Sequence, residues 1–218
     1  MVLTDGYHDV PLGKVATVVT HLEMRAPAPL RPVPTPEGVS LRRVIDPDLG
    51  WYRDLFNRVG GQDWMWFSRL EMTDTALAAI IGNPGVQILS LDKDGQSQGL
   101  LELDFRVPGE CELAFFGVTA SMIGTGAGRF VMNAAISLAW DHPISRFHLH
   151  TCTLDNPMAL AFYRRSGFTP THQQIEIADD PRLSGGLPET AAPHVPMFAP
   201  GTGPDTGPDT GPDTKPDS

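Results

Sequence analysis

Two periods of hydrophobic and polar positions alternate along this chain. Within residues 99–106, apolar and charged residues alternate from Leu101 onwards, which puts Leu101 and Leu103 on one face of a strand and Glu102 and Asp104 on the other. Further apolar or β-branched runs predict strands at 16–24, 39–44, 86–91, 111–118, 146–152 and 173–177. Short turns between several of these runs indicate antiparallel neighbours.

Segments with a period near 3.6 residues lie between the strands. They predict helices at 48–58, 73–81, 128–140 and 157–166. Gly60 and Gly61 are expected to end the first of these helices, and Gly167 the last. Because the third helix connects two strands, 111–118 and 146–152, those strands are predicted to be parallel neighbours.

A glycine-rich loop joins the strand at 111–118 to the third helix. Gly124, Gly126 and Gly128 alternate there, and the first N–H groups of a helix are free to bind an anion. A dinucleotide fingerprint does not fit, because Arg129 takes the place of its third glycine. A nucleotide P-loop does not fit either, because Gly-Lys-Ser/Thr is absent. By itself the loop is compatible with a phosphate site or with a turn that binds nothing.

A second motif follows the strand at 146–152. Five residues have the spacing N-x-x-A-x-x-x-Y and then G-F: Asn156, Ala159, Tyr163, Gly167 and Phe168. Together with the loop at 123–128, read as Q/R-x-x-G-x-G/A, this pattern resembles the GNAT superfamily of acyl-CoA-dependent N-acyltransferases over residues 39–170. Ile123 departs from the family pattern, which has Gln or Arg at that position.

The resemblance implies an α/β (α+β) fold: a mixed, mostly antiparallel sheet with a central splayed parallel strand pair, flanked by helices. We divide the chain accordingly. A proline-rich N-terminal extension with an added strand (1–38) precedes the acetyltransferase domain (39–178). An irregular arm (179–200) follows, and the Thr-Gly-Pro-Asp repeats of the tail (201–218) are expected to be disordered.

Acetyl-CoA is implied as the co-substrate. Its pyrophosphate is expected on the glycine loop, and its pantetheine arm along the backbone at the end of the preceding strand. The residues expected to bind it are Phe116, Gly117, Val118, Ile123, Gly124, Thr125, Gly126, Ala127, Gly128, Arg129, Asn156 and Tyr163.

The resemblance also suggests the catalytic groups. Tyr163 is expected near the thioester sulfur, where its hydroxyl would protonate the departing thiolate. Glu112 corresponds to a catalytic glutamate of the histone-acetylating branch and is predicted to share a face with Ala114 and Phe116. Glu102 on the neighbouring strand is the alternative base, and two solvated strand faces are a third interpretation.

An aromatic cluster lies in the segment that covers the acceptor site in this fold. Trp51, Trp64 and Trp66 are expected to bind the acceptor, for example by cation–π contact, although core packing is the commoner use of tryptophan. The predicted activity is acetyl transfer from acetyl-CoA to a primary amine of a small molecule or peptide. The alternative is an inactive CoA-binding or protein-interaction module.

Composition excludes several other classes. The formal charge of −10 disfavours nucleic-acid binding and suits a cationic acceptor. Two cysteines, and no signal or membrane-length apolar run, are typical of a cytoplasmic protein. His148, His150 and Cys152 share one strand face, but their spacing does not suit a structural zinc site, so no metal is expected. A homodimer is left open.

Overall fold

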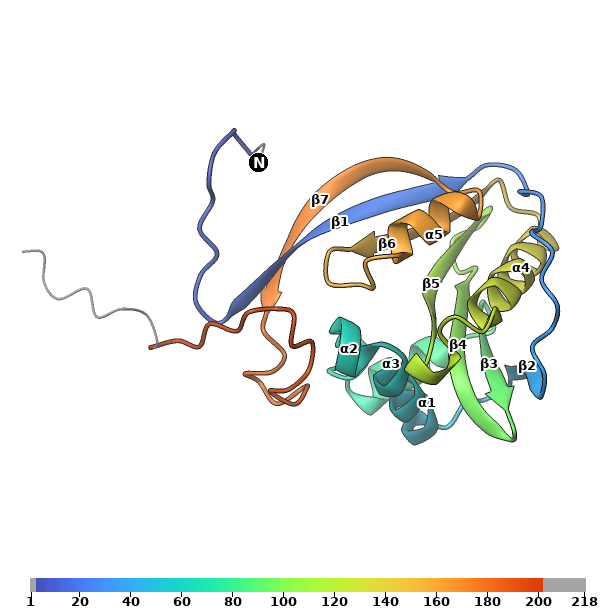
Figure 1. Ribbon diagram of the computed structural model, residues 1–218, viewed down its shortest axis with the longest axis horizontal. Helices are drawn as coiled ribbons and strands as arrows, with labels where there is room; N and C mark the ends of the chain where they lie inside the picture. Colours follow the sequence, from blue (N-terminus) through green and yellow to red (C-terminus); the bar gives the residue numbers. More distant parts are fainter. Residues whose placement is uncertain (1–2, 202–218) are drawn as a thin grey trace, which may run out of the picture.

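The computed structural model describes residues 3–201 and contains a seven-stranded sheet with helices on both faces (Figure 1). The strands follow the order β2-β3-β4-β5-β6-β1-β7, and β5 and β6 are the parallel pair among antiparallel neighbours. Their bounds are β1 Lys14–Met24, β2 Val39–Val44, β3 Val86–Lys93, β4 Gln96–Asp104, β5 Glu110–Val118, β6 Arg146–Cys152 and β7 Thr169–Asp179. The predicted fold class is confirmed. The repeat tail lies outside the described residues except for Gly201.

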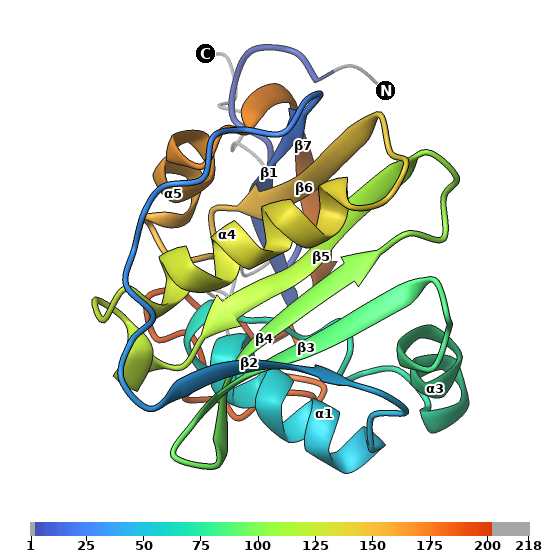
Figure 2. The same cartoon turned by 90° about the vertical axis from the view of Figure 1, so that its right-hand side faces the viewer.

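Helix α4 (Ala127–Trp140) covers one face of the sheet and crosses the strands obliquely (Figure 2). Small side chains such as Ala135 and Ala139 are fully buried on its inner side, so the helix lies close to the strands. Leu101, Leu103 and Phe147 of the sheet pack into the same core. Helix α5 (Ala159–Arg165) lies beside α4 on this face.

Helices α1 (Leu49–Phe56) and α3 (Asp74–Ile81) cover the other face. Asp48 caps α1, because its carboxylate accepts a hydrogen bond of 2.8 Å from the backbone N–H of Trp51. Tyr52, Leu55 and Phe56 of α1 form a second core with strands β3 and β4. Both faces of β4 are therefore covered, and the strict alternation along this strand does not mark a solvated face.

The glycine pair at 60–61 does not end the first helical segment, contrary to the prediction. A π-helical turn at Asn57–Gly61 carries the chain on into α2 (Gln62–Trp64). The segment ends only at Met65, which has the left-handed φ of 60°. Packing requires a glycine at position 60, since a Cβ there would collide with the ring of Trp66. Helix propensity is here subordinate to tertiary packing.

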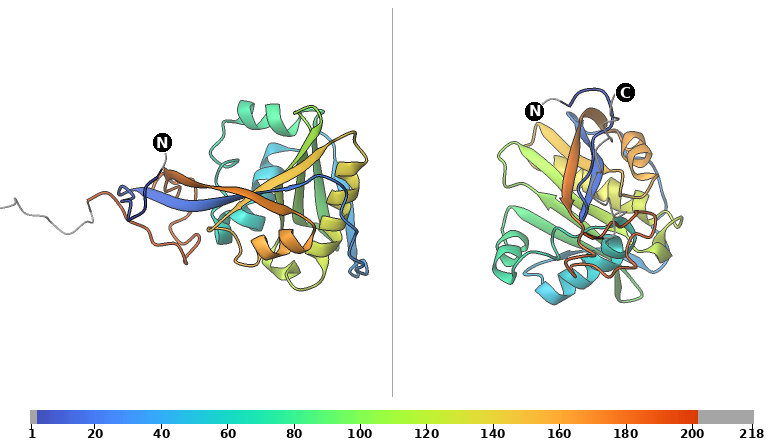
Figure 3. Two further views of the ribbon diagram at one scale, coloured as in Figure 1. Left: turned by 90° about the horizontal axis from the view of Figure 1, so that it is seen from above. Right: turned by 90° about the vertical axis from the view of Figure 1, so that its left-hand side faces the viewer.

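Strand β1, predicted as an addition to the core, is an interior strand of the sheet. It pairs with β6 on one side and with β7 on the other. The two strands β1 and β7 extend together as a curved ribbon beyond the rest of the sheet (Figure 3). Without β1, the edges of β6 and β7 would have no partner in this sheet, so the N-terminal residues are part of the fold.

The C-terminal arm packs on the body through only some of its apolar side chains. Leu187 and Ala192 are buried against Met65, whereas Leu183 and Phe198 are exposed. The backbone N–H of Ala192 donates a 2.8 Å hydrogen bond to the carbonyl of Gln62. Among the residues that the structure describes, no helix is long and apolar enough to cross a membrane.

Candidate active site

The parallel strands β5 and β6 separate towards their carboxyl ends. Their pairing stops at Glu112 and His148, and from there each strand is hydrogen-bonded only to its outer neighbour. The inner edge of β5 from Leu113 to Val118 thus offers N–H and C=O groups that no strand uses. A cleft of about 790 Å³ occupies this opening and extends from the glycine loop to the carboxylates near Glu112.

A β-bulge changes which side chains of β5 share a face. Glu102 is opposite Phe115 and Leu103 is opposite Leu113, so Ala114 has no partner on β4. After the bulge, Phe115 packs on the α1 side and Phe116 on the α4 side. The predicted common face of Glu112, Ala114 and Phe116 is therefore wrong, because the extra residue shifts the alternation by one.

The glycine loop has the conformation of an anion site. Gly124 and Gly126 have φ values of 82° and 89°, which glycine adopts without strain. Helix α4 begins at Ala127, and the Thr125 hydroxyl accepts the Ala127 N–H at 3.3 Å. The N–H groups of Gly128 and Arg129 have no acceptor within the helix, and a Cβ at Gly128 would meet nothing within 4 Å. Open space, free N–H groups and an arginine fit a pyrophosphate.

Most residues expected to bind the co-substrate line the cleft. These are Phe116, Gly117, Val118, Ile123, Gly124, Gly126, Gly128, Arg129, Asn156 and Tyr163. Thr125 and Ala127 do not line it. Thr125 stabilises the loop from within, through its hydroxyl bond of 2.8 Å to the Met122 carbonyl, and the Ala127 side chain is buried in the core.

Tyr163 projects from α5 into the cleft. Its ring packs against those of Phe116, Phe162 and Phe168. Burial, followed by the negative charge of Asp155, raises the pKa of the phenol above its usual value. No hydrogen bond of the Tyr163 hydroxyl is formed within residues 3–201, so a neutral proton donor is available to a ligand.

Asp155 is a cleft residue that the two sequence motifs do not include. Its carboxylate accepts hydrogen bonds from the Trp66 indole N–H at 3.0 Å and from the Cys152 backbone N–H at 2.9 Å. Asn156 instead caps the following turn by accepting from the Met158 N–H at 2.9 Å. Asp155 thus connects the segment that carries Trp66 to the end of β6. No local pattern predicts a partner 89 residues away.

The three tryptophans have different positions. Trp66 lines the cleft and also packs against Phe56 and Phe115, with centroid distances of 5.4 and 5.3 Å. Trp64 lines the cleft near His194 of the C-terminal arm. Trp51 does not line the cleft; it packs in the α1 core, and its indole N–H donates to the Ser97 hydroxyl at 3.2 Å. The expectation of acceptor binding does not fit Trp51.

The far end of the cleft carries acidic side chains. Asp104 is paired with Arg106, whose hydrogen bonds outweigh the effect of burial and lower the Asp104 pKa. Glu112 is half-buried, and its carboxylate lies 3.8 Å from the Nδ1 atom of His150. Glu176 of β7 also lines the cleft, but it is opposite Thr17 of β1, beyond the carboxyl end of β6, and therefore lies away from Glu112. At this end of the cleft, Glu112 therefore forms no ion pair with an arginine or lysine within residues 3–201.

Glu102, the alternative base, does not reach the cleft. Its carboxylate is fully buried and accepts hydrogen bonds of 2.5 Å from the Tyr52 hydroxyl and from Arg69. Burial and then the Glu102 charge raise the Tyr52 pKa, so this phenol remains a donor. Glu102 therefore forms a structural ion pair with Arg69. Because α1 covers its side of β4, Glu102 is not expected to act as the base.

Metal-ligating side chains do not converge in the described part of the chain. His148, His150 and Cys152 follow one face of β6 as predicted from their alternation, and His148 lies 3.4 Å from Glu110. Within residues 3–201, no three His, Cys, Asp or Glu side chains form a group that could hold a metal ion.

A parallel strand pair that opens beside a glycine loop, with a helix starting at the loop, is the arrangement expected of acyl-CoA-dependent acyltransferases. Residues 51–168 match a family model described as acetyltransferase (GNAT) family. The chain therefore belongs to the GNAT acetyltransferase family, as its two motifs predicted. Acetyl transfer from acetyl-CoA is the chemistry of that family.

Individual relatives are distant. The mycothiol acetyltransferase of Jonesia denitrificans is 36% identical over 66 residues, which are 30% of this chain and 21% of that protein. A GCN5-related N-acetyltransferase from Sphaerobacter thermophilus has a TM-score of 0.56 at 15% identity, over 80% of this chain and 53% of that one. A tandem GNAT protein from the clavulanic acid biosynthesis pathway has a TM-score of 0.53 at 17% identity, over 79% and 55%.

Each of these relatives is longer than the part of it that matches this chain. The chain spans about a fifth of the length of the mycothiol acetyltransferase and about half the length of the two structures. At identities this low, the likeness to the two structures concerns the fold alone.

Proposed function

We propose that this chain transfers an acetyl group from acetyl-CoA to a primary amine of a small molecule or peptide, by direct attack in a ternary complex. The observation that carries the proposal is a cleft that joins the glycine loop to the carboxylate of Glu112. One end suits the phosphates of the co-substrate and the other suits a cationic acceptor, with Tyr163 between them.

Each end of the cleft has a defined task in this proposal. Bound acetyl-CoA supplies an activated acyl group as a thioester. The Gly128 and Arg129 N–H groups hold its pyrophosphate, and the free edge of β5 orients the pantetheine arm. Tyr163 keeps its proton at neutral pH, because its pKa is raised, and delivers that proton to the thiolate that leaves.

The acceptor amine needs a base, because an amine with a pKa of about 10.4 is protonated at neutral pH. Glu112 belongs to β5, and its carboxylate is exposed in the cleft. His150 lies beside it. We assign removal of the amine proton to Glu112, either directly or through one water molecule. Trp64, Trp66 and Phe115 form an apolar wall, which suits an amine on an apolar or aromatic body.

Release of free thiol from acetyl-CoA tests the proposal. The purified chain is assayed with a panel of primary amines and with the matching alcohols, and CoA binding is measured in parallel by calorimetry. Amine-dependent thiol release supports the proposal. Tight CoA binding without thiol release for any amine would favour an inactive CoA-binding module, the alternative that Ile123 suggests. A chain that binds no CoA contradicts both.

The two candidate bases are separated by paired Glu→Gln variants. Glu112→Gln is expected to lower kcat by about 10²- to 10⁴-fold and leave the melting temperature unchanged, because its side chain is half-exposed. Glu102→Gln breaks a buried ion pair and is expected to cost about 3–5 kcal/mol of unfolding free energy. Thermal melting and steady-state kinetics on both variants check this. Full activity in Glu112→Gln contradicts the assignment.

The two cleft tryptophans are expected to respond differently to truncation. Trp64→Ala should raise the KM of the acceptor and leave the KM of acetyl-CoA and the melting temperature nearly unchanged, because Trp64 is outside the large cores. Trp66→Ala should also lose about 3 kcal/mol of stability, because its ring packs in the α1 core. Trp66→Phe is the control that keeps a ring. Equal stability losses in both alanine variants would mean that Trp64 is a core residue.

A further inference from the structure

The proline-rich segment of residues 25–38, here called the strap, crosses the α4–α5 side of the molecule (Figure 2). A Cβ at Gly167, just after α5, would collide with Ala28. The side-chain amide of Asn133 in α4 donates a 2.6 Å hydrogen bond to the Arg31 carbonyl. A Cβ at Gly126 would lie 3.2 Å from Val33. The strap thus runs from the end of α5, over α4, to Gly126 at the start of α4.

Arginines gather where the strap passes between the two helices. Arg129 extends from α4 to α5, where it donates to the Ser166 hydroxyl at 2.9 Å and lies 4.6 Å from the centre of the Phe162 ring. Partial burial, and then the positive charges of Arg31 and Arg165, lower the Arg129 pKa. Within residues 3–201 none of the three guanidinium groups forms an ion pair with a carboxylate.

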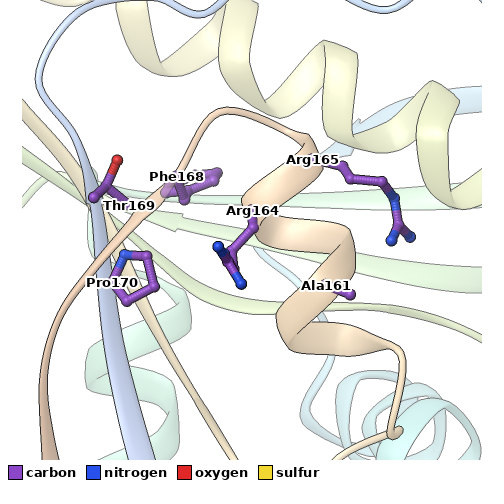
Figure 4. Close-up of a pocket in the computed structure, with 6 residues that line it drawn as sticks. All are labelled: Ala161, Arg164, Arg165, Phe168, Thr169 and Pro170. Carbon is purple, nitrogen blue, oxygen red and sulfur yellow. The ribbon is translucent and has the colours of Figure 1, made fainter.

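Arg165 and its neighbour Arg164 have different surroundings. Figure 4 shows Arg164 turned towards Pro170 in a hollow beside α5, whereas Arg165 projects from the other side of the helix. Both arginines line the hollow, but only the charge of Arg165, together with that of Arg31, acts on Arg129, so Arg31, Arg129 and Arg165 are treated as one cluster. Mutual repulsion of like charges is unfavourable unless an anion joins them, and guanidinium groups are well suited to phosphate because they donate two parallel hydrogen bonds.

The position of the cluster indicates which phosphate it would hold. In the binding mode proposed above, the pantetheine arm follows β5 inwards from the glycine loop, so the ribose of the same molecule would leave the loop on its outer side, where Val33 of the strap lies beside Gly126. The N–H groups at the start of α4 are sufficient for the pyrophosphate. The remaining anionic group of CoA is the 3′-phosphate of its ribose, which would arrive where the strap crosses α4.

We propose that the strap is part of the co-substrate site, and that Arg31 with Arg129 and Arg165 binds the 3′-phosphate of CoA. This inference rests on the proposed function, and it makes the N-terminal extension a determinant of co-substrate specificity. The five prolines of the strap restrict its unfolded conformations, so Arg31 is held over α4 at a low entropic cost.

Calorimetric titration of the full chain with CoA and with dephospho-CoA tests this inference. The wild type is expected to bind CoA more tightly than dephospho-CoA. Arg31→Ala should weaken CoA binding on the order of tenfold and leave dephospho-CoA binding unchanged, because one charge-assisted contact is lost. Asn133→Ala, which releases the strap from α4, should shift the same ratio in the same direction. Arg43→Ala removes an equal charge from exposed β2 and should match the wild type.

Three outcomes would overturn the inference. Equal weakening of both ligands in Arg31→Ala would mean that Arg31 acts on the pyrophosphate. Unchanged binding of both ligands would remove Arg31 from the site. A wild type that does not discriminate between the ligands would exclude a 3′-phosphate subsite. Each of these outcomes leaves acetyl transfer intact, whereas a wild type that binds no CoA would contradict the proposed function itself.

Discussion

Gly128→Glu is expected to abolish CoA binding and leave the protein folded. Gly128 is the second residue of α4, its φ is not positive, and a Cβ there would meet nothing within 4 Å. A carboxylate in the first turn of a helix is favourable for the free protein. Repulsion between this carboxylate and a phosphate about 4 Å away, near a protein surface, costs about 4 kcal/mol of binding free energy. This corresponds to roughly a thousandfold loss of affinity.

Gly128→Ala is the matched control, because it adds a side chain without charge and should change affinity only slightly. Calorimetry with CoA and thermal melting measure both variants. Gly126 is a poorer choice, since its φ of 89° strains any side chain and Val33 is close. A folded Gly128→Glu protein with wild-type affinity for CoA would show that the phosphates bind elsewhere.

Tyr163→Phe is expected to lower kcat by about 10²-fold or more without a change in melting temperature. The substitution keeps the ring contacts with Phe116 and Phe168 and removes a hydroxyl that has no protein partner within residues 3–201. Acetyl-CoA affinity should stay close to that of the wild type. A variant that turns over at the wild-type rate would mean that another group protonates the thiolate.

The pH dependence of the wild type provides a second check on Tyr163. Because burial raises its pKa above the usual value of about 10, the protonated and catalytically useful form dominates from neutral pH into the alkaline range. The loss of activity that Tyr163 controls should therefore appear only above that usual value. A titration of kcat that falls between pH 7 and 9 must come from another group, and Tyr163→Phe should still show it.

Local patterns predicted the elements that form the co-substrate end of the site. The glycines at 124, 126 and 128 and the motif from Asn156 to Phe168 depend on short-range requirements of turns and helix starts, which the sequence shows directly. The parallel pairing of β5 and β6 followed from the helix between them. These features were predictable because each depends on residues that are close in the chain.

The end of the cleft near Glu112, where we propose that the acceptor binds, was predicted less well, because it depends on contacts between distant segments. Glu102 occupies a polar position in the alternating pattern of its strand, as a solvated residue would. Only the packing of α1 on β4 buries it. The bulge at Ala114 has no local signature, yet it decides which side chains face the cleft with Glu112. The sequence gives no reason to treat Trp51 and Trp66 differently, but of the two only Trp66 donates a hydrogen bond to Asp155.

The sequence by itself determined the family, the glycine loop and the placement of Tyr163 on a helix after the parallel strand, since these follow from spacing and backbone chemistry. Only the tertiary structure decided that β1 is an interior strand and that the strap lies over α4 beside the glycine loop. The physical reason is that strand pairing and side-chain packing join segments more than a hundred residues apart, and no periodicity along the chain encodes which segments will meet.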